Sequence, residues 1–144
     1  MQPPALSAEE IGQLLSEEFP QAFYPGCGLF VERVEYGSAR VRKVCHKDHL
    51  RPGGTVSGPT MMELGDFAMY VAVLSAIGAQ PLAVTTNFSI NFLRKPTPAD
   101  LLAEAKLMKI GKRLAVGEVS IYSEGLGEPV AHVTSTYSIP NAGN

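Results

Sequence analysis

The chain has 144 residues, 45% of them hydrophobic, so it can bury a full core, and we expect one globular domain over residues 1–144. Twelve basic and fourteen acidic residues give a formal net charge of -2, with no dense basic run. This charge pattern argues against a nucleic-acid-binding protein. Cys27 and Cys45 lack metal-ligand spacing and no leader-like segment precedes them, so we expect free thiols and a cytoplasmic protein, with a disulfide as the alternative.

The first predicted element is a short helix over residues 8–19. Ser7 and Glu10 have the spacing of a capping box, and Pro20 ends the amphipathic pattern. We expect this N-terminal segment, residues 1–22, to be peripheral.

Two strands are predicted next, over residues 29–36 and 39–45, joined as a hairpin at Gly37-Ser38. The second strand alternates between two faces. One face carries Ala39, Val41, Lys43 and Cys45, and the other carries Arg40, Arg42 and Val44.

A long helix is predicted over residues 57–78, with Ser57 as N-cap, Pro59 near its first position and Gly78 at its end. It is apolar on nearly all sides, and Glu63 and Asp66 are its only ionisable residues. Each carboxylate would cost about 2.5 to 3.5 kcal/mol near a bilayer centre, so a membrane span is disfavoured. A core helix wrapped by a sheet fits better.

After this helix the pattern changes to period two. In residues 82–93 the even-numbered positions from Leu82 to Phe92 are mostly apolar, so we expect that face to pack on the core and the odd-numbered face, with Thr85, to be polar. Strands over residues 101–110, 113–122 and 129–139 follow. The order predicts an α+β domain in which a curved antiparallel sheet wraps a central helix, the hotdog arrangement.

The segment Arg51-Pro-Gly-Gly-Thr-Val-Ser-Gly-Pro59, followed by Leu64-Gly65-Asp66, resembles the motif of the PaaI-like acyl-CoA thioesterases of the hotdog superfamily. Gly58 matches the first glycine of the family's His-Gly-Gly, and Asp66 matches its catalytic acid. Three positions depart: Ser57 replaces the histidine, Pro59 the second glycine and Arg51 the usual asparagine. The resemblance covers about residues 29–139.

The resemblance implies hydrolysis of an acyl-coenzyme A thioester without a cofactor. Asp66 would act as general base or as nucleophile, and the Gly58 N–H, in the first turn of the helix, would be the oxyanion donor. Pro59 forfeits only an amide that the helix leaves unpaired. The structural alternative is a buried aspartate that caps a loop or pairs with Arg51 or another basic residue.

Other candidate residues each have a structural alternative. Glu63, one turn before Asp66 on the same helical face, is a second active-site carboxylate or a surface residue. Thr85 holds a hydroxyl near the attacking water or is an ordinary strand threonine. Ser57 is an N-cap rather than a nucleophile. Arg51 binds a phosphate or a polar acyl group, or pairs with a carboxylate.

The remaining substrate-binding candidates are Gly54, which fits the turn before the helix, Asn87 on the following strand, and three cations beside turns, where the family contacts the nucleotide end of coenzyme A. These cations are Lys95, Lys112 and Arg113, and solvated turn residues are the alternative for each. His46, His49 and His132 lack metal-ligand spacing, so no metal is expected.

An isolated hotdog domain exposes a sheet edge, so a homo-oligomer is expected, and the resemblance implies at least a dimer and favours a tetramer. Two chains would share each site, for example with Asp66 facing Thr85 or Asn87 of a neighbour.

Two other functions stay open: a non-catalytic acyl-CoA or lipid-binding protein, and a hotdog hydratase or dehydratase, against which the missing histidine at position 57 argues. The acyl group is not specified.

Overall fold

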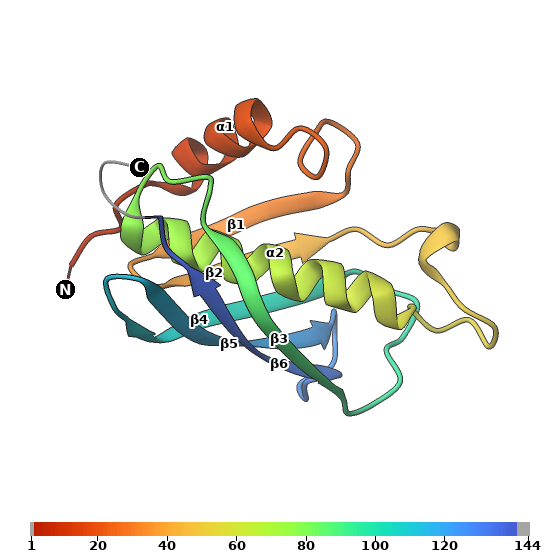
Figure 1. Ribbon diagram of the computed structural model, residues 1–144. Coiled ribbons are helices and arrows are strands. Elements are labelled where there is room, and N and C mark those ends of the chain that lie inside the picture. Colours follow the sequence, from red (N-terminus) through yellow and green to blue (C-terminus); the bar gives the residue numbers. More distant parts are fainter. Residues whose placement is uncertain (1, 141–144) are drawn as a thin grey trace.

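The long apolar helix packs across one face of a six-stranded antiparallel sheet (Figure 1). The computed structural model describes residues 2–140. In chain order the elements are α1 (Ala8–Glu18), β1 (Leu29–Glu35), β2 (Ser38–Lys43), the 3-10 turn η1 (Lys47–His49), α2 (Gly58–Ile77), β3 (Val84–Phe92), β4 (Leu101–Ile110), β5 (Leu114–Ser123) and β6 (Ala131–Ser138). The strands lie in the order β1-β2-β4-β5-β6-β3. This is the predicted hotdog fold.

Helix α2 begins and ends where the sequence predicts. The Ser57 hydroxyl accepts a hydrogen bond from the Thr60 N–H at 3.4 Å, and Gly78 caps the other end with φ +84°. By length and composition this helix could cross a membrane, but most of its apolar stretch is buried inside the fold. It contacts all six strands, as expected of a core helix.

Helix α1 has the predicted capping box: the Glu10 N–H donates to the Ser7 hydroxyl at 3.1 Å, and the Ser7 N–H donates to the Glu10 carboxylate at 2.9 Å. The helix lies outside the sheet, where it packs on β1 and α2. It contributes more to the core than a peripheral segment would, because Ile11 and Leu15 are fully buried.

Strand β2 alternates as predicted. Ala39, Val41 and Lys43 lie on the buried face. Lys43 is only 5% exposed, and its ammonium donates to the Cys27 carbonyl at 2.9 Å, with Glu63 3.6 Å away. The Cys27 carbonyl and the Glu63 carboxylate compensate the buried ammonium charge.

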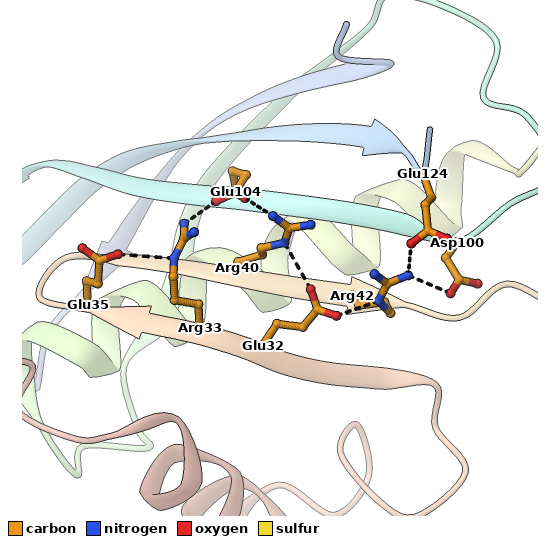
Figure 2. Close-up of polar contacts among 8 residues, drawn as sticks. All are labelled: Glu32, Arg33, Glu35, Arg40, Arg42, Asp100, Glu104 and Glu124. Atoms are coloured by element: carbon orange, nitrogen blue, oxygen red, sulfur yellow. Dashed lines mark hydrogen bonds and ion pairs between the residues drawn. The ribbon is translucent and has the colours of Figure 1, made fainter. Parts of the chain in front are cut away.

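The other face of β1, β2 and β4 carries a ladder of ion pairs, which Figure 2 shows. Arg42 is its best-connected member, with hydrogen bonds to Glu32, Asp100 and Glu124. These bonds raise the pKa of the Arg42 guanidinium above its usual range, and the bond from Arg42 lowers the pKa of the Glu32 carboxyl. The pairs are partly exposed, so each contributes at most about 1 kcal/mol to stability.

Strand β3 breaks the predicted alternation. Thr85 pairs with Tyr137 and Asn87 with Thr136, so one extra residue forms a bulge between them. Phe88 and Ile90 face the core as expected. The predicted inward positions 82, 84, 86 and 92 are exposed instead. The bulge reverses the faces at the Val84 end, and at the other end Phe92 lies half-exposed beside Gly58, the first residue of α2.

Gly117 lies where β5 passes closest to β4 and α2. A Cβ atom there would be 2.8 Å from the Lys106 carbonyl oxygen and 2.9 Å from the Met69 sulfur. Both distances are shorter than normal contacts, and the backbone carbonyl cannot move away freely.

We therefore expect Gly117→Ala to lower the free energy of unfolding by about 1 to 3 kcal/mol through overpacking. The measurement is the urea unfolding midpoint at matched protein concentration. Gly127→Ala is the control, because nothing lies within 4 Å of its added Cβ, and it should change stability by less than about 0.5 kcal/mol. Equal midpoints for the two variants would contradict the close contact.

Candidate functional site

Asp66 is half-buried on α2, and its carboxylate is held by two hydroxyl groups from the same chain. Thr85 donates to Oδ1 at 2.7 Å, and Tyr137 donates to the same oxygen at 3.0 Å. The Tyr137 hydroxyl also lies 3.1 Å from the main-chain carbonyl of Asp66. Both side-chain bonds end on Oδ1, so Oδ2 takes part in neither. The alternative prediction, that Asp66 pairs with Arg51, is wrong.

The β3 bulge creates this arrangement. Tyr137 is on the buried face of β6, and its direct cross-strand partner is Thr85. Beyond the bulge the inward positions of β3 are even-numbered, yet at Thr85 an odd-numbered side chain reaches the helix. Thr85 therefore contacts Asp66, and the prediction that it lies on the face opposite Phe88 is wrong.

Tyr137 is fixed by its surroundings. Its ring stacks on that of Tyr70, with centroids 5.8 Å apart and planes at 16°. Burial, followed by the neighbouring charge of Asp66, raises the pKa of the Tyr137 hydroxyl well above its usual range. Burial also raises the pKa of Tyr70, whose hydroxyl donates to the Pro81 carbonyl at 2.6 Å. Both phenols stay protonated and act as donors.

A pocket of about 380 Å³ opens beside the carboxylate. Its walls are mainly apolar and aromatic, with one further acidic residue. The lining residues are Glu18, Phe19, Asp66, Tyr70, Pro81, Leu82, Ala83, Val84, Thr85 and Tyr137. This pocket lies between the end of α1, α2 and the beginning of β3.

A second pocket, of about 680 Å³, lies at the N-terminus of α2. Gly58 lines it, and a Cβ added to Gly58 would be 3.3 Å from the ring of Phe92. Three cationic residues also line it: Arg51, Arg94 and Lys95. Unpaired first-turn amides, the helix dipole and these cations favour an anion at this place.

The two pockets are separate within one chain. Gly58 and Asp66 are eight residues apart on α2, which corresponds to about 12 Å along a helix. Gly58 lines the pocket at the helix N-terminus, and Asp66 lines the one near α1. A single thioester carbonyl cannot contact both groups of one protomer.

Glu63 does not join Asp66. Its exposed side chain points toward Lys43 of β2, whereas Asp66 points toward β3 and β6 at the other edge of the sheet. The two carboxylates therefore lean to opposite sides of α2, and the prediction of a shared face is wrong. Glu63 is therefore a surface residue, which was the alternative prediction for it.

Arg51 and Gly54 both lie in the loop before α2, but only Arg51 lines the pocket there. The Arg51 N–H donates to the Thr55 carbonyl at 2.8 Å, and Gly54 adopts φ +77°, which favours glycine in this tight turn. Arg51 lines the pocket; Gly54 does not and is a turn residue. Within residues 2–140, no carboxylate lies within 4.0 Å of the Arg51 guanidinium.

The remaining candidates are spread over the sheet. Lys95 lines the pocket of Gly58. Lys112 and Arg113 are exposed in the turn between β4 and β5, near the Val84 end of β3, because Leu114 pairs with Ser138 and Ser138 with Val84. Asn87 is exposed, and its main-chain carbonyl accepts a hydrogen bond from the Ser135 hydroxyl. One protomer does not bring these residues together.

Tyr137 and Arg94 are site residues that sequence reasoning missed. A tyrosine at an inward position of a strand needs a partner for its hydroxyl, and that requirement was the available signal for Tyr137. Arg94 adjoins the candidate Lys95 in sequence, so the argument that selected Lys95 applied equally to Arg94.

Comparisons with known proteins agree with this fold. The family model "Thioesterase superfamily" matches residues 53–130. A protein from Silicibacter sp. TM1040, provisionally assigned as a thioesterase, is 43% identical with a TM-score of 0.85, covering 95% of this chain and 94% of its own. A mutant of the phenylacetic acid degradation protein PaaI from Thermus thermophilus is 28% identical with a TM-score of 0.72, covering 82% of this chain and 98% of its own.

A curated relative from Saccharolobus solfataricus, provisionally assigned as an esterase, is 29% identical over 83% of this chain and 77% of its own length. These relatives support thioester hydrolysis as the general activity. With the family model spanning all of α2, including Asp66, and strands β3 to β5, the chain belongs to the thioesterase superfamily.

Proposed function

We propose that the protein hydrolyses acyl-coenzyme A thioesters, with Asp66 as the reacting carboxylate. The observation that carries this proposal is the carboxylate of Asp66, oriented by two hydroxyl bonds at the wall of an apolar pocket. An apolar pocket suits an acyl group, and a fixed carboxylate suits attack on its carbonyl carbon.

Two routes fit the geometry. Asp66 takes a proton from a water molecule that attacks the thioester, or its own oxygen attacks to give a mixed anhydride that water then hydrolyses. In both routes the C–S bond breaks, the thiolate of coenzyme A leaves and is protonated, and a carboxylic acid is released. No cofactor is required.

Gly58 is the proposed oxyanion donor. Its N–H belongs to the first turn of α2, where amides have no intrahelical partner and the dipole is positive. Serine at position 57 caps this helix, so the missing histidine leaves the helix start intact. Arg51, Arg94 and Lys95 around the same pocket suit the phosphates of coenzyme A.

A second copy of the chain is needed to complete the site. Strand β3 is an edge strand that is antiparallel to its neighbour and has no partner on its outer side within residues 2–140. Its end at Phe92 contacts Gly58, and its end at Thr85 contacts Asp66. Val84 is 57% exposed and Phe92 50%, so both strand ends offer apolar surface to a partner.

Two copies of β3 paired antiparallel about Phe88 would place Phe92 of one protomer opposite Val84 of the other, about 4.8 Å away. Gly58 of one protomer would then lie beside Asp66 of the partner subunit. The cationic pocket of one protomer would then adjoin the apolar pocket of its partner. The cations suit the phosphates of an acyl-CoA, and the apolar pocket suits its acyl group. This arrangement revises the expectation that Thr85 of a neighbour faces Asp66, because Thr85 of the same chain already does.

Removing the carboxylate is the first test. In a panel of short, medium, long and aromatic acyl-CoA esters, we expect Asp66→Asn and Asp66→Ala to lower thiol release by about 10²- to 10⁴-fold for every ester that the wild type hydrolyses. Asp100→Asn is the control, because this carboxylate only supports the ion-pair ladder through Arg42. It should retain activity.

Thiol release that survives in Asp66→Asn would contradict the proposal. A wild type that binds acyl-CoA but releases no thiol from any ester would favour the non-catalytic binding protein.

Mixed dimers test the shared site. We expect Gly58→Val and Asp66→Asn each to be inactive alone, the first because its side chain collides with Phe92 and fills the pocket. A mixed dimer purified with two tags would contain one intact site, so its activity should be about half that of a wild-type dimer. If Gly58 and Asp66 act from the same chain, the mixed dimer will stay inactive.

A further inference from the structure

Both hydrogen bonds to Asp66 end on one of its two oxygens. Thr85 and Tyr137 are direct partners across β3 and β6, and each hydroxyl reaches Oδ1, at 2.7 Å and 3.0 Å. A carboxylate oxygen accepts about two such bonds in its plane. Oδ1 is therefore fully occupied, and Oδ2 has no hydrogen-bond partner among residues 2–140.

Burial and stacking hold the Tyr137 side chain firmly beside Asp66. It is 3% exposed, and the stack on Tyr70 fixes its ring. A buried phenol needs a partner for its proton, and the Tyr137 hydroxyl donates to the carboxylate and the main-chain carbonyl of Asp66. The bulge in β3 then adds the second hydroxyl from Thr85.

We propose that Tyr137 is a positioning residue: with Thr85 it holds Oδ1 of Asp66, so that Oδ2 is the oxygen that meets water or the thioester carbon. This assignment rests on the proposed hydrolase function and goes beyond it by naming the reacting atom. It applies to both routes, since each needs one free, correctly aimed carboxylate oxygen.

The other ionisable groups around Asp66 do not provide this orientation. Tyr70 on α2 donates to Pro81 instead, and Glu18 at the end of α1 lines the same pocket without a hydrogen bond to Asp66. Glu63 on α2 turns toward Lys43. Among residues 2–140, Tyr137 is the ionisable group that donates a hydrogen bond to this carboxylate.

Tyr137→Phe removes only the hydroxyl. Losing this donor lets the carboxylate turn away from its reacting orientation, while the pocket for the acyl group keeps its shape. We therefore expect kcat to fall about tenfold with KM nearly unchanged. Thr85→Val should lower kcat in the same way.

Tyr122→Phe is the matched control, because it removes a phenol hydroxyl from β5 at a residue that lines neither the pocket of Asp66 nor that of Gly58. Its kcat should equal that of the wild type. Unfolding midpoints and assembly state, measured for each variant, separate a structural loss from a positioning effect.

The outcomes separate this inference from the proposed function. If the wild type releases no thiol, the hydrolase proposal fails. If the wild type is active but kcat of Tyr137→Phe equals that of Tyr122→Phe, Tyr137 is not a positioning residue. Should Tyr137→Phe not fold, a folded Thr85→Val variant with an unchanged kcat would equally overturn the assignment of Oδ1 and Oδ2.

Discussion

A helix of 20 residues that is apolar on nearly every side cannot rest on a flat surface without leaving much of itself in water. In this protein the sheet solves the problem by bringing all six strands into contact with α2. Where this cover stops, the helix presents its polar features: the first-turn amides near Gly58 at one end, and Asp66 on the flank toward β3. The candidate site thus occupies the places that the sheet leaves open.

The bulge in β3 determines what the uncovered flank can do. A regular strand that places Phe88 and Ile90 against the core would turn Thr85 away from it. One extra residue reverses the faces without disturbing the packing farther along. The strand therefore supplies apolar packing at its middle and a hydrogen bond at its end, so that folding and site geometry are satisfied by the same element.

Most of the fold could be predicted from the sequence, because periodicity and caps are local signals. Ser57 and Gly78 define α2, and the alternation of β2 holds through Lys43. Asp66 stood out because an isolated carboxylate in an apolar helix demands a reason. Its bonds to Thr85 and Tyr137 of the same chain could not be predicted, since the pairing of these two residues depends on strand order and on a bulge that no local pattern marks. The orientation of Glu63 was likewise set by Lys43 on a distant strand.

The strand order also fixes when the site can form during synthesis. Strand β3 emerges directly after α2, yet its neighbour in the sheet is β6, the last of the six strands to be made. Until β6 arrives, β3 has neither of its edges paired, and Asp66 lacks Tyr137. A growing chain must therefore carry an unpaired, partly apolar strand through the translation of about forty residues, the span from Phe92 to Ala131. Throughout that interval β3 is open to chaperones and to misassembly.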